Sequence, residues 1–204
     1  MRVLPILAAF LITNAAQAET ATIIAPVFAQ LVTAPLPDGF APAYENANET
    51  GYINEAVPEG ESVEDWSQMV TLTGAKGLAL GAEAVDADGF AEFLAESYHQ
   101  ACPDSFSATA LDVDAVPGVQ DFFAGYLSCG SLNGGPMSES MVFLVLVGAE
   151  DIYSLQWAEH GPASAAPIGF PGGVWQDRLA LLHARAKVCD IIPGEQPPYP
   201  SCTD

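Results

Sequence analysis

Three histidines, His99, His160 and His183, are the side chains of this 204-residue chain best suited to acid–base chemistry. A histidine can act as a general base near neutral pH when a carboxylate or another acceptor orients its ring. His160 stands out because the segment WAEHG ends an expected strand and leads into a long loop of small residues, 161–173. Glu159 is its neighbour in sequence, but adjacent strand residues face opposite sides, so the carboxylate would have to come from elsewhere. We expect a surface histidine at a strand end, and a hydrolase using His160 is the alternative.

Basic side chains are scarce and concentrated near the end of the chain. The sequence has 26 acidic residues against five Lys and Arg, and its formal net charge is −21. Arg178, Arg185 and Lys187 lie on one expected helix, where Arg178 and Arg185 share a face because they are seven residues apart. Together with His160, the residues Arg178 and Arg185 form a candidate ligand patch for an anion. The favoured interpretation is that these cations pair with local carboxylates and attach the helix to a sheet.

The stretch VPEGESVEDWSQMVTLTG, residues 57–74, contains acidic side chains that could coordinate a cation. They are Glu59, Glu61, Glu64 and Asp65. A structural role explains the same stretch, because PEG favours a turn with Gly60 at positive φ and S-x-x-D resembles a capping motif. Trp66 can then anchor a strand by burying its ring. We expect scaffold here, with a calcium- or cation-binding protein as an alternative, and we assign no catalytic residue, cofactor or metal ligand.

The strong negative charge excludes one large class of partners. A field of this sign repels phosphate backbones, so we expect no nucleic-acid binding. Beyond the opening segment the longest apolar run, 141–149, has nine residues, whereas a membrane-spanning helix needs about twenty. The sequence therefore predicts no transmembrane segment in the mature chain.

The opening MRVLPILAAFLITNAAQA is typical of a secretory signal peptide. Arg2 supplies the positive charge, an apolar stretch follows, and Ala16-Gln17-Ala18 is a small-x-small cleavage site. We expect residues 1–18 to be removed, leaving one α+β domain over 19–204 in the periplasm or outside a bacterial cell.

Four cysteines, Cys102, Cys129, Cys189 and Cys202, predict two disulfides in an oxidising compartment. Three pairings are possible. We favour Cys189 with Cys202, because they flank a proline-rich tail, 190–204, that needs fastening. Cys102 with Cys129 would then join a helix end to a strand.

The pattern of apolar residues predicts strands first, a helix, more antiparallel strands and a closing helix. Residues 19–34 are rich in Ala and Thr and are expected to be partly helical. Alternation in WSQMVTLTG predicts a strand with Trp66, Val70 and Leu72 on one face. Residues 88–102 have the apolar spacing of an amphipathic helix capped by Asp88, and the closing helix is expected over 174–190.

Short turns between strands favour antiparallel pairing, since parallel strands need a crossover each time. The predicted fold class is therefore α+β, with an antiparallel sheet of about 5–7 strands and two main helices packed on it.

The combination of VPEGESVEDWSQMVTLTG, a helix ending in Cys-Pro and a closing segment ending in Val-Cys-Asp resembles a group of uncharacterised exported bacterial proteins. Its shared string is P-x-G-E followed by W-S-x-M-x-T. The element order is also similar to the PsbP-like α+β sandwich. That resemblance implies a binding or accessory module, and no activity or site residue follows from it.

The leading hypothesis is accordingly a non-catalytic exported module that binds or assists a protein or small ligand. It rests on the lack of a recognisable catalytic motif and on the single long loop. The loop and the last helix, rather than the acidic stretch, are the expected place for function.

Overall fold

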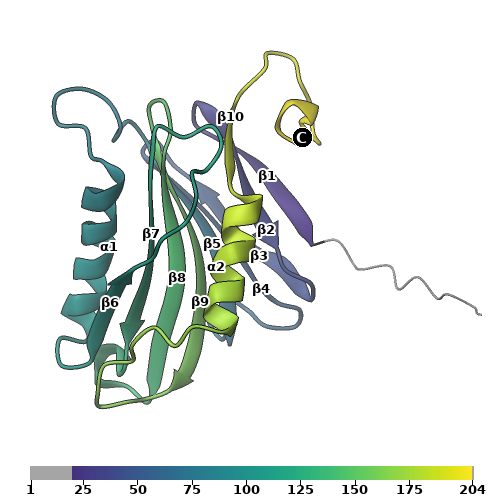
Figure 1. Ribbon diagram of the computed structural model, residues 1–204. Helices are drawn as coiled ribbons and strands as arrows, with labels where there is room; N and C mark the ends of the chain where they lie inside the picture. The colour runs from purple at the N-terminus through teal and green to yellow at the C-terminus, as the bar shows by residue number, and fades with distance from the viewer. Residues whose placement is uncertain (1–19, 204) are drawn as a thin grey trace, which may run out of the picture.

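The computed structural model describes residues 20–203, so the expected signal peptide, residues 1–18, lies outside the described residues. Within residues 20–203, ten strands form two antiparallel sheets and two α-helices pack on them, which confirms the α+β class but exceeds the expected five to seven strands. The larger sheet has seven strands in the order β3-β4-β5-β9-β8-β7-β6, and the smaller has three in the order β1-β2-β10 (Figure 1). The strands are β1 (Ala21–Val27), β2 (Gln30–Leu36), β3 (Phe40–Ala47), β4 (Gly51–Pro58), β5 (Gln68–Ala75), β6 (Phe106–Ala110), β7 (Asp121–Cys129), β8 (Met137–Val147), β9 (Ile152–Pro162) and β10 (Lys187–Asp190). The helices are α1 (Ala87–Ala101) and α2 (Val174–Arg185).

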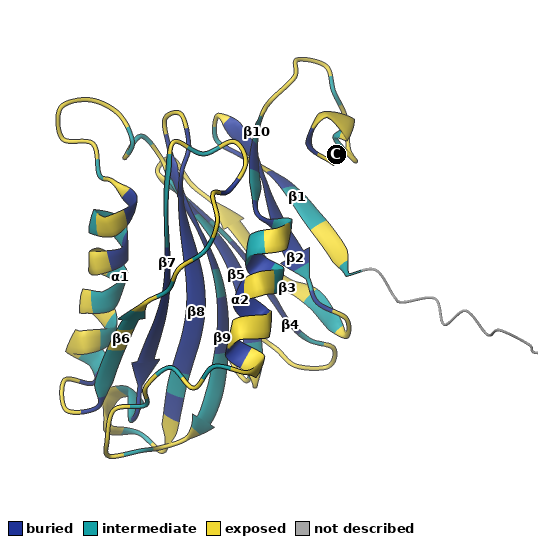
Figure 2. Ribbon diagram, viewed as in Figure 1, coloured by how far each residue is buried: buried dark blue, intermediate teal, exposed yellow. Residues whose placement is uncertain are grey.

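The seven-stranded sheet is covered on both faces. Helix α1 packs against β6, β7 and β8 on one side, which we call the α1 face. Helix α2 and the three-stranded sheet pack on the other side, the α2 face. β8 lies between β7 and β9 and is buried on both sides, because its continuous apolar run supplies side chains to both cores (Figure 2).

The prediction for the N-terminal segment is wrong. Residues 19–34 were expected to be partly helical, yet β1 and β2 form an antiparallel hairpin in which Val27 pairs with Gln30. β-branched residues favour strands, and the inner side of the hairpin places Val27 and Val32 in the core on the α2 face. This tertiary burial outweighs the helix propensity of the alanines.

The closing helix is shorter than predicted. Its expected apolar residues Trp175, Leu179 and Leu182 are buried, but α2 ends at Arg185 instead of continuing to residue 190. β10 follows and pairs with β2, which would otherwise lack a neighbour on that side. The hydroxyl of Thr33 in β2 donates to the backbone carbonyl of Arg185 at the helix end.

The start of α1 also differs from the prediction. The N-cap lies two residues earlier than expected, because the Asp86 carboxylate, not that of Asp88, accepts a hydrogen bond from the Gly89 backbone N–H at 2.8 Å. Among residues 20–203, no helix is long and apolar enough to cross a membrane.

The two disulfides have the pairing favoured from the sequence. Cys102, just after α1, is bonded to Cys129 at the end of β7, with their Cα atoms 5.7 Å apart. Cys189 in β10 is bonded to Cys202 in the C-terminal tail, with a Cα separation of 5.8 Å. The second bridge folds the tail back onto the three-stranded sheet.

Candidate functional site

His160 lies in β9 on the α1 face of the large sheet, and both of its ring nitrogens are engaged. Nδ1 is 3.1 Å from the backbone oxygen of Trp66, and Nε2 is 3.1 Å from Oε2 of Glu139. The imidazole also stacks on the Trp66 ring, with 3.7 Å between the centroids. Glu139 is the carboxylate that His160 needed from elsewhere, because the β8–β9 register places the two residues directly opposite each other.

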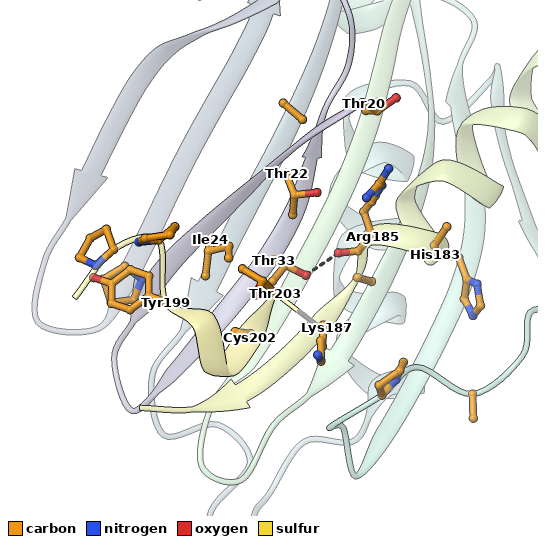
Figure 3. A pocket seen from close by; sticks show the side chains of 18 residues that line it. Thr20, Thr22, Ile24, Thr33, His183, Arg185, Lys187, Tyr199, Cys202 and Thr203 are labelled. Carbon is orange, nitrogen blue, oxygen red and sulfur yellow. Dashed lines mark hydrogen bonds between the residues drawn. The ribbon is translucent and has the colours of Figure 1, made fainter. Parts of the chain in front are cut away.

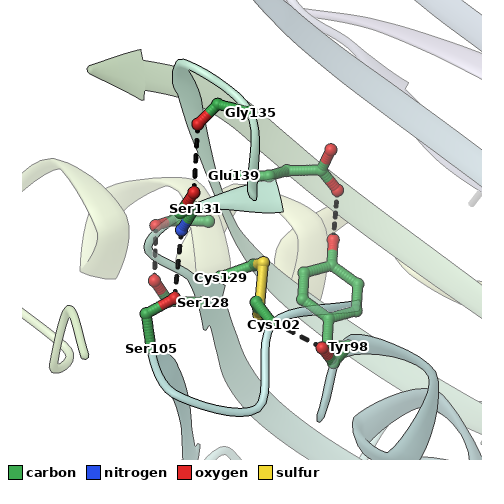
Figure 4. Close-up of a disulfide and its surroundings, with 9 residues drawn as sticks. Tyr98, Cys102, Ser105, Ser128, Cys129, Ser131, Gly135 and Glu139 are labelled. Carbon is green, nitrogen blue, oxygen red and sulfur yellow. Dashed lines mark hydrogen bonds between the residues drawn. A yellow bond between two sulfur atoms is a disulfide. The ribbon is translucent and has the colours of Figure 1, made fainter. Parts of the chain in front are cut away.

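Glu139 connects His160 to helix α1. Its second carboxylate oxygen, Oε1, accepts a hydrogen bond from the hydroxyl of Tyr98 (Figure 4). Burial raises the pKa of the Tyr98 phenol well above its usual range, and the neighbouring Glu139 charge and hydrogen bond add to this effect. Tyr98 stands one helical turn before Cys102, so the Cys102–Cys129 disulfide holds the helix end close to this network.

The bonding of this network favours a structural role. The Trp66 carbonyl and the Glu139 carboxylate each lie within hydrogen-bond distance of one ring nitrogen of His160, so both nitrogens face groups of the chain itself. This arrangement favours an orienting role for the ring over proton transfer with a substrate. We interpret the Tyr98–Glu139–His160 network as a clamp that holds Trp66 against the sheet.

The position of Trp66 in this clamp differs from the predicted one. The expected strand placed it on the same face as Val70 and Leu72, but β5 begins only at Gln68 and the Trp66 ring packs on the α1 face. The preceding turn explains the difference, because the Glu61 carboxylate accepts hydrogen bonds from the Ser67 backbone N–H and hydroxyl at 2.6 and 2.7 Å. These bonds lower the pKa of Glu61.

Arg178 lies on the α2 face, away from His160. Its Nη2 donates to the Glu159 carboxylate and to Oε1 of Gln68, the latter at 2.8 Å. The guanidinium carbon lies 4.5 Å from the Trp175 ring centroid and 5.4 Å from that of Trp157. Arg178 is only 7% exposed, so it pairs with local groups and attaches α2 to the sheet, as the favoured interpretation expected.

Arg185 lines a large groove of about 950 Å³ on the outer side of the three-stranded sheet (Figure 3). The strand register determines which residues form the floor of the groove. Lys187 pairs with Thr33 and Thr33 pairs with Ile24, so all three share the outer face of the sheet. The end of α2 borders the groove on one side and the disulfide-tethered tail on the other. The residues that line it are Thr20, Ala21, Thr22, Ile24, Pro26, Thr33, Ala115, Pro117, His183, Ala184, Arg185, Ala186, Lys187, Pro197, Pro198, Tyr199, Cys202 and Thr203.

The charge of this groove contrasts with that of the whole chain. No Asp or Glu occurs among the described residues that line it, whereas Arg185 and Lys187 both do. Within residues 20–203 the guanidinium of Arg185 makes no hydrogen bond or ion pair, although the side chain is half-buried. His183 is fixed at the rim by a 2.9 Å contact between Nε2 and the backbone oxygen of Asp114. The arrangement can accept a negatively charged group.

The candidate ligand patch of His160, Arg178 and Arg185 is therefore divided among three places. His160 is in the clamp on the α1 face, Arg178 pins α2 on the opposite face, and Arg185 lines the groove. The groove was missed from the sequence because the expected helix over 174–190 concealed β10. Among the described residues, no group of three or more His, Cys, Asp or Glu side chains could hold a metal ion.

No family model matches the chain, and no curated protein sequence matches it. Two solved structures are similar to it at a distance: the Saccharomyces cerevisiae Ran-binding protein Mog1p and a mutant of protein Mog1. The first is 13% identical with a TM-score of 0.42, covering 72% of this chain and 79% of that one. The second has the same identity and TM-score and covers 71% and 79%. A likeness this distant carries no argument about activity or partner.

Proposed function

We propose that this chain is a non-catalytic exported module that binds a partner in the groove between β1, the end of α2 and the C-terminal tail. The observation that carries the proposal is the unpaired, half-buried Arg185 in a groove lined by no carboxylate of the described chain. The guanidinium of Arg185 has no counter-ion within residues 20–203, so a ligand carboxylate can form charge-assisted hydrogen bonds with it.

The test is to locate binding by NMR with a panel of small probes: organic acids, amines, aromatic fragments and short peptides. We expect amide shifts that cluster on the groove, and we expect Ala184→Trp to abolish them by filling it. Ala165→Trp is the matched control, because Ala165 is equally exposed but lies in the 163–173 loop. Shifts that cluster elsewhere, or that Ala184→Trp leaves unchanged, would contradict the proposal.

A hydrolase remains the second candidate because His160 does have a carboxylate, Glu139, within 3.1 Å. Its test is a panel of ester, phosphate, peptide and glycan substrates with the wild-type chain and with His160→Ala. Turnover that His160→Ala removes, in a variant that still folds, would overturn the non-catalytic proposal.

A further inference from the structure

The groove has features that point to one class of occupant. We infer that it binds an extended, acidic polypeptide segment of a partner protein, whose carboxylates pair with Arg185. The inference rests on the proposed function, because it names the partner of the same groove.

The charge distribution of the chain supports an acidic occupant. Of the 26 acidic residues, none of those described lines the groove, while Arg185 projects into it. Arginine presents several donors in a planar fork that fits a carboxylate, so Arg185 is suited to hold one. Screening limits the repulsion from the rest of the surface to about 8 Å at physiological ionic strength, which lets the local positive charge dominate inside the groove.

The acidic surface also contributes to selectivity. An acidic segment is repelled by the carboxylate-rich surface elsewhere and is stabilised only where that surface is interrupted. The groove is such an interruption, so the chain disfavours other binding positions as well as favouring this one.

The shape of the groove supports an extended chain as the occupant. It is lined by β1, the end of α2 and the tail, and its volume of about 950 Å³ lies at the upper end for small-molecule sites. β1 is the edge of its sheet, since no other strand of residues 20–203 pairs with its outer side. An extended segment can form backbone hydrogen bonds along such an edge.

The tail forms a preorganised wall of the groove. The Cys189–Cys202 disulfide fixes it next to β10, and Pro197, Pro198 and Tyr199 supply rigid apolar surface. Preorganised walls reduce the entropy lost on binding, and prolines and an aromatic ring can contact the apolar side chains of an extended segment.

The experiment measures fluorescence anisotropy of a labelled decapeptide of alternating Glu and Thr, with the Gln and Thr peptide as its uncharged counterpart. We expect the Glu peptide to bind at least tenfold more tightly than the Gln peptide at physiological ionic strength, where screening limits the repulsion from the rest of the acidic surface. Arg185→Glu should weaken binding at least tenfold. Lys76→Glu is the matched control, because it changes the net charge equally but lies outside the groove, beside Phe28, and it should change affinity less than twofold.

Each contrary outcome has a distinct meaning. If both peptides bind equally and Arg185→Glu has no effect on either, the acidic occupant is refuted while the binding function stands. If succinate or inorganic phosphate binds the groove as tightly as the peptide, the occupant is a small anion and the polypeptide is refuted. If the chain self-associates in sedimentation and Arg185→Glu disperses it, the occupant is a second copy. If no probe of any charge shifts the groove amides, the proposed function fails as well.

Discussion

Replacement of Arg178 by Met tests whether this cation is structural or belongs to a ligand site. Methionine keeps an apolar side chain of similar length between the Trp157 and Trp175 rings, so the substitution removes mainly the charge and its hydrogen bonds. We expect the variant to fold with lower stability and to leave peptide binding in the groove unchanged.

The size of the effect follows from what Arg178 contacts. Removing one partner of a buried ion pair costs about 3–5 kcal/mol. The Glu159 side chain is 39% exposed, so water rehydrates its carboxylate and the expected cost falls to about 2–3 kcal/mol. For a domain of this size each kcal/mol lowers Tm by about 2–4 °C, so we expect a decrease of roughly 5–10 °C.

The assay is thermal and guanidinium unfolding, with Arg185→Met as the matched control on the same helix. The Arg185 guanidinium makes no contact with a described partner, so its loss should change the unfolding free energy by less than about 0.5 kcal/mol. Equal stability of the two variants would refute the assignment of Arg178 as the pin of α2. A loss of peptide affinity in Arg178→Met would refute its separation from the groove.

Three further predictions concern the backbone, the tail and alkaline pH. Gly118→Ala should cost at least ~2 kcal/mol of unfolding free energy, because Gly118 has φ +81° and a Cβ there would lie 1.8 Å from a backbone oxygen of β10; near-wild-type denaturant stability would contradict this. Replacing Cys189 and Cys202 together by Ser opens a loop with a separation of 13 residues, which should cost about 3 kcal/mol; an unchanged Tm would show that the tail is held without the bridge. Burial raises the pKa of Tyr98 and of Tyr153 above that of the unfolded chain, so stability should persist up to about pH 10 and fall at higher pH, where only the unfolded chain loses these protons. Guanidinium unfolding between pH 9 and 11 measures the slope, which Tyr98→Phe should flatten; equal slopes in variant and wild type would count against this cause.

Several features of the fold could be predicted because they depend on local patterns. The antiparallel pairing of the strands, the strand that begins near Gln68 and the helix α1 follow from apolar periodicity and turn residues. The disulfide pairing followed from the need to fasten a proline-rich tail, which is a property of one short segment.

The failed predictions occurred where distant residues compete with local preference. Residues 21–36 became a hairpin because its inner side chains fill the core on the α2 face. The segment after Arg185 became β10 because β2 offers an unpaired edge, which no local pattern reveals. Trp66 packs on the α1 face because the distant residue His160 stacks on its ring, while Glu61 fixes the next residue, Ser67.

For the candidate sites, too, the sequence determined some features and the tertiary structure decided the others. From the sequence alone one could conclude that the chain is strongly acidic, that most of its few cations lie near its end, and that Glu159 faces the side of its strand opposite to His160. Only the tertiary structure decided that Glu139 in β8 meets His160 in the neighbouring strand β9, that Arg178 is buried against two tryptophan rings, and that Arg185 projects into a groove with no carboxylate among its described lining residues. The physical reason is that residue type and spacing determine local conformation and charge, whereas the face on which each side chain meets a partner depends on strand register and on packing between segments far apart in the chain.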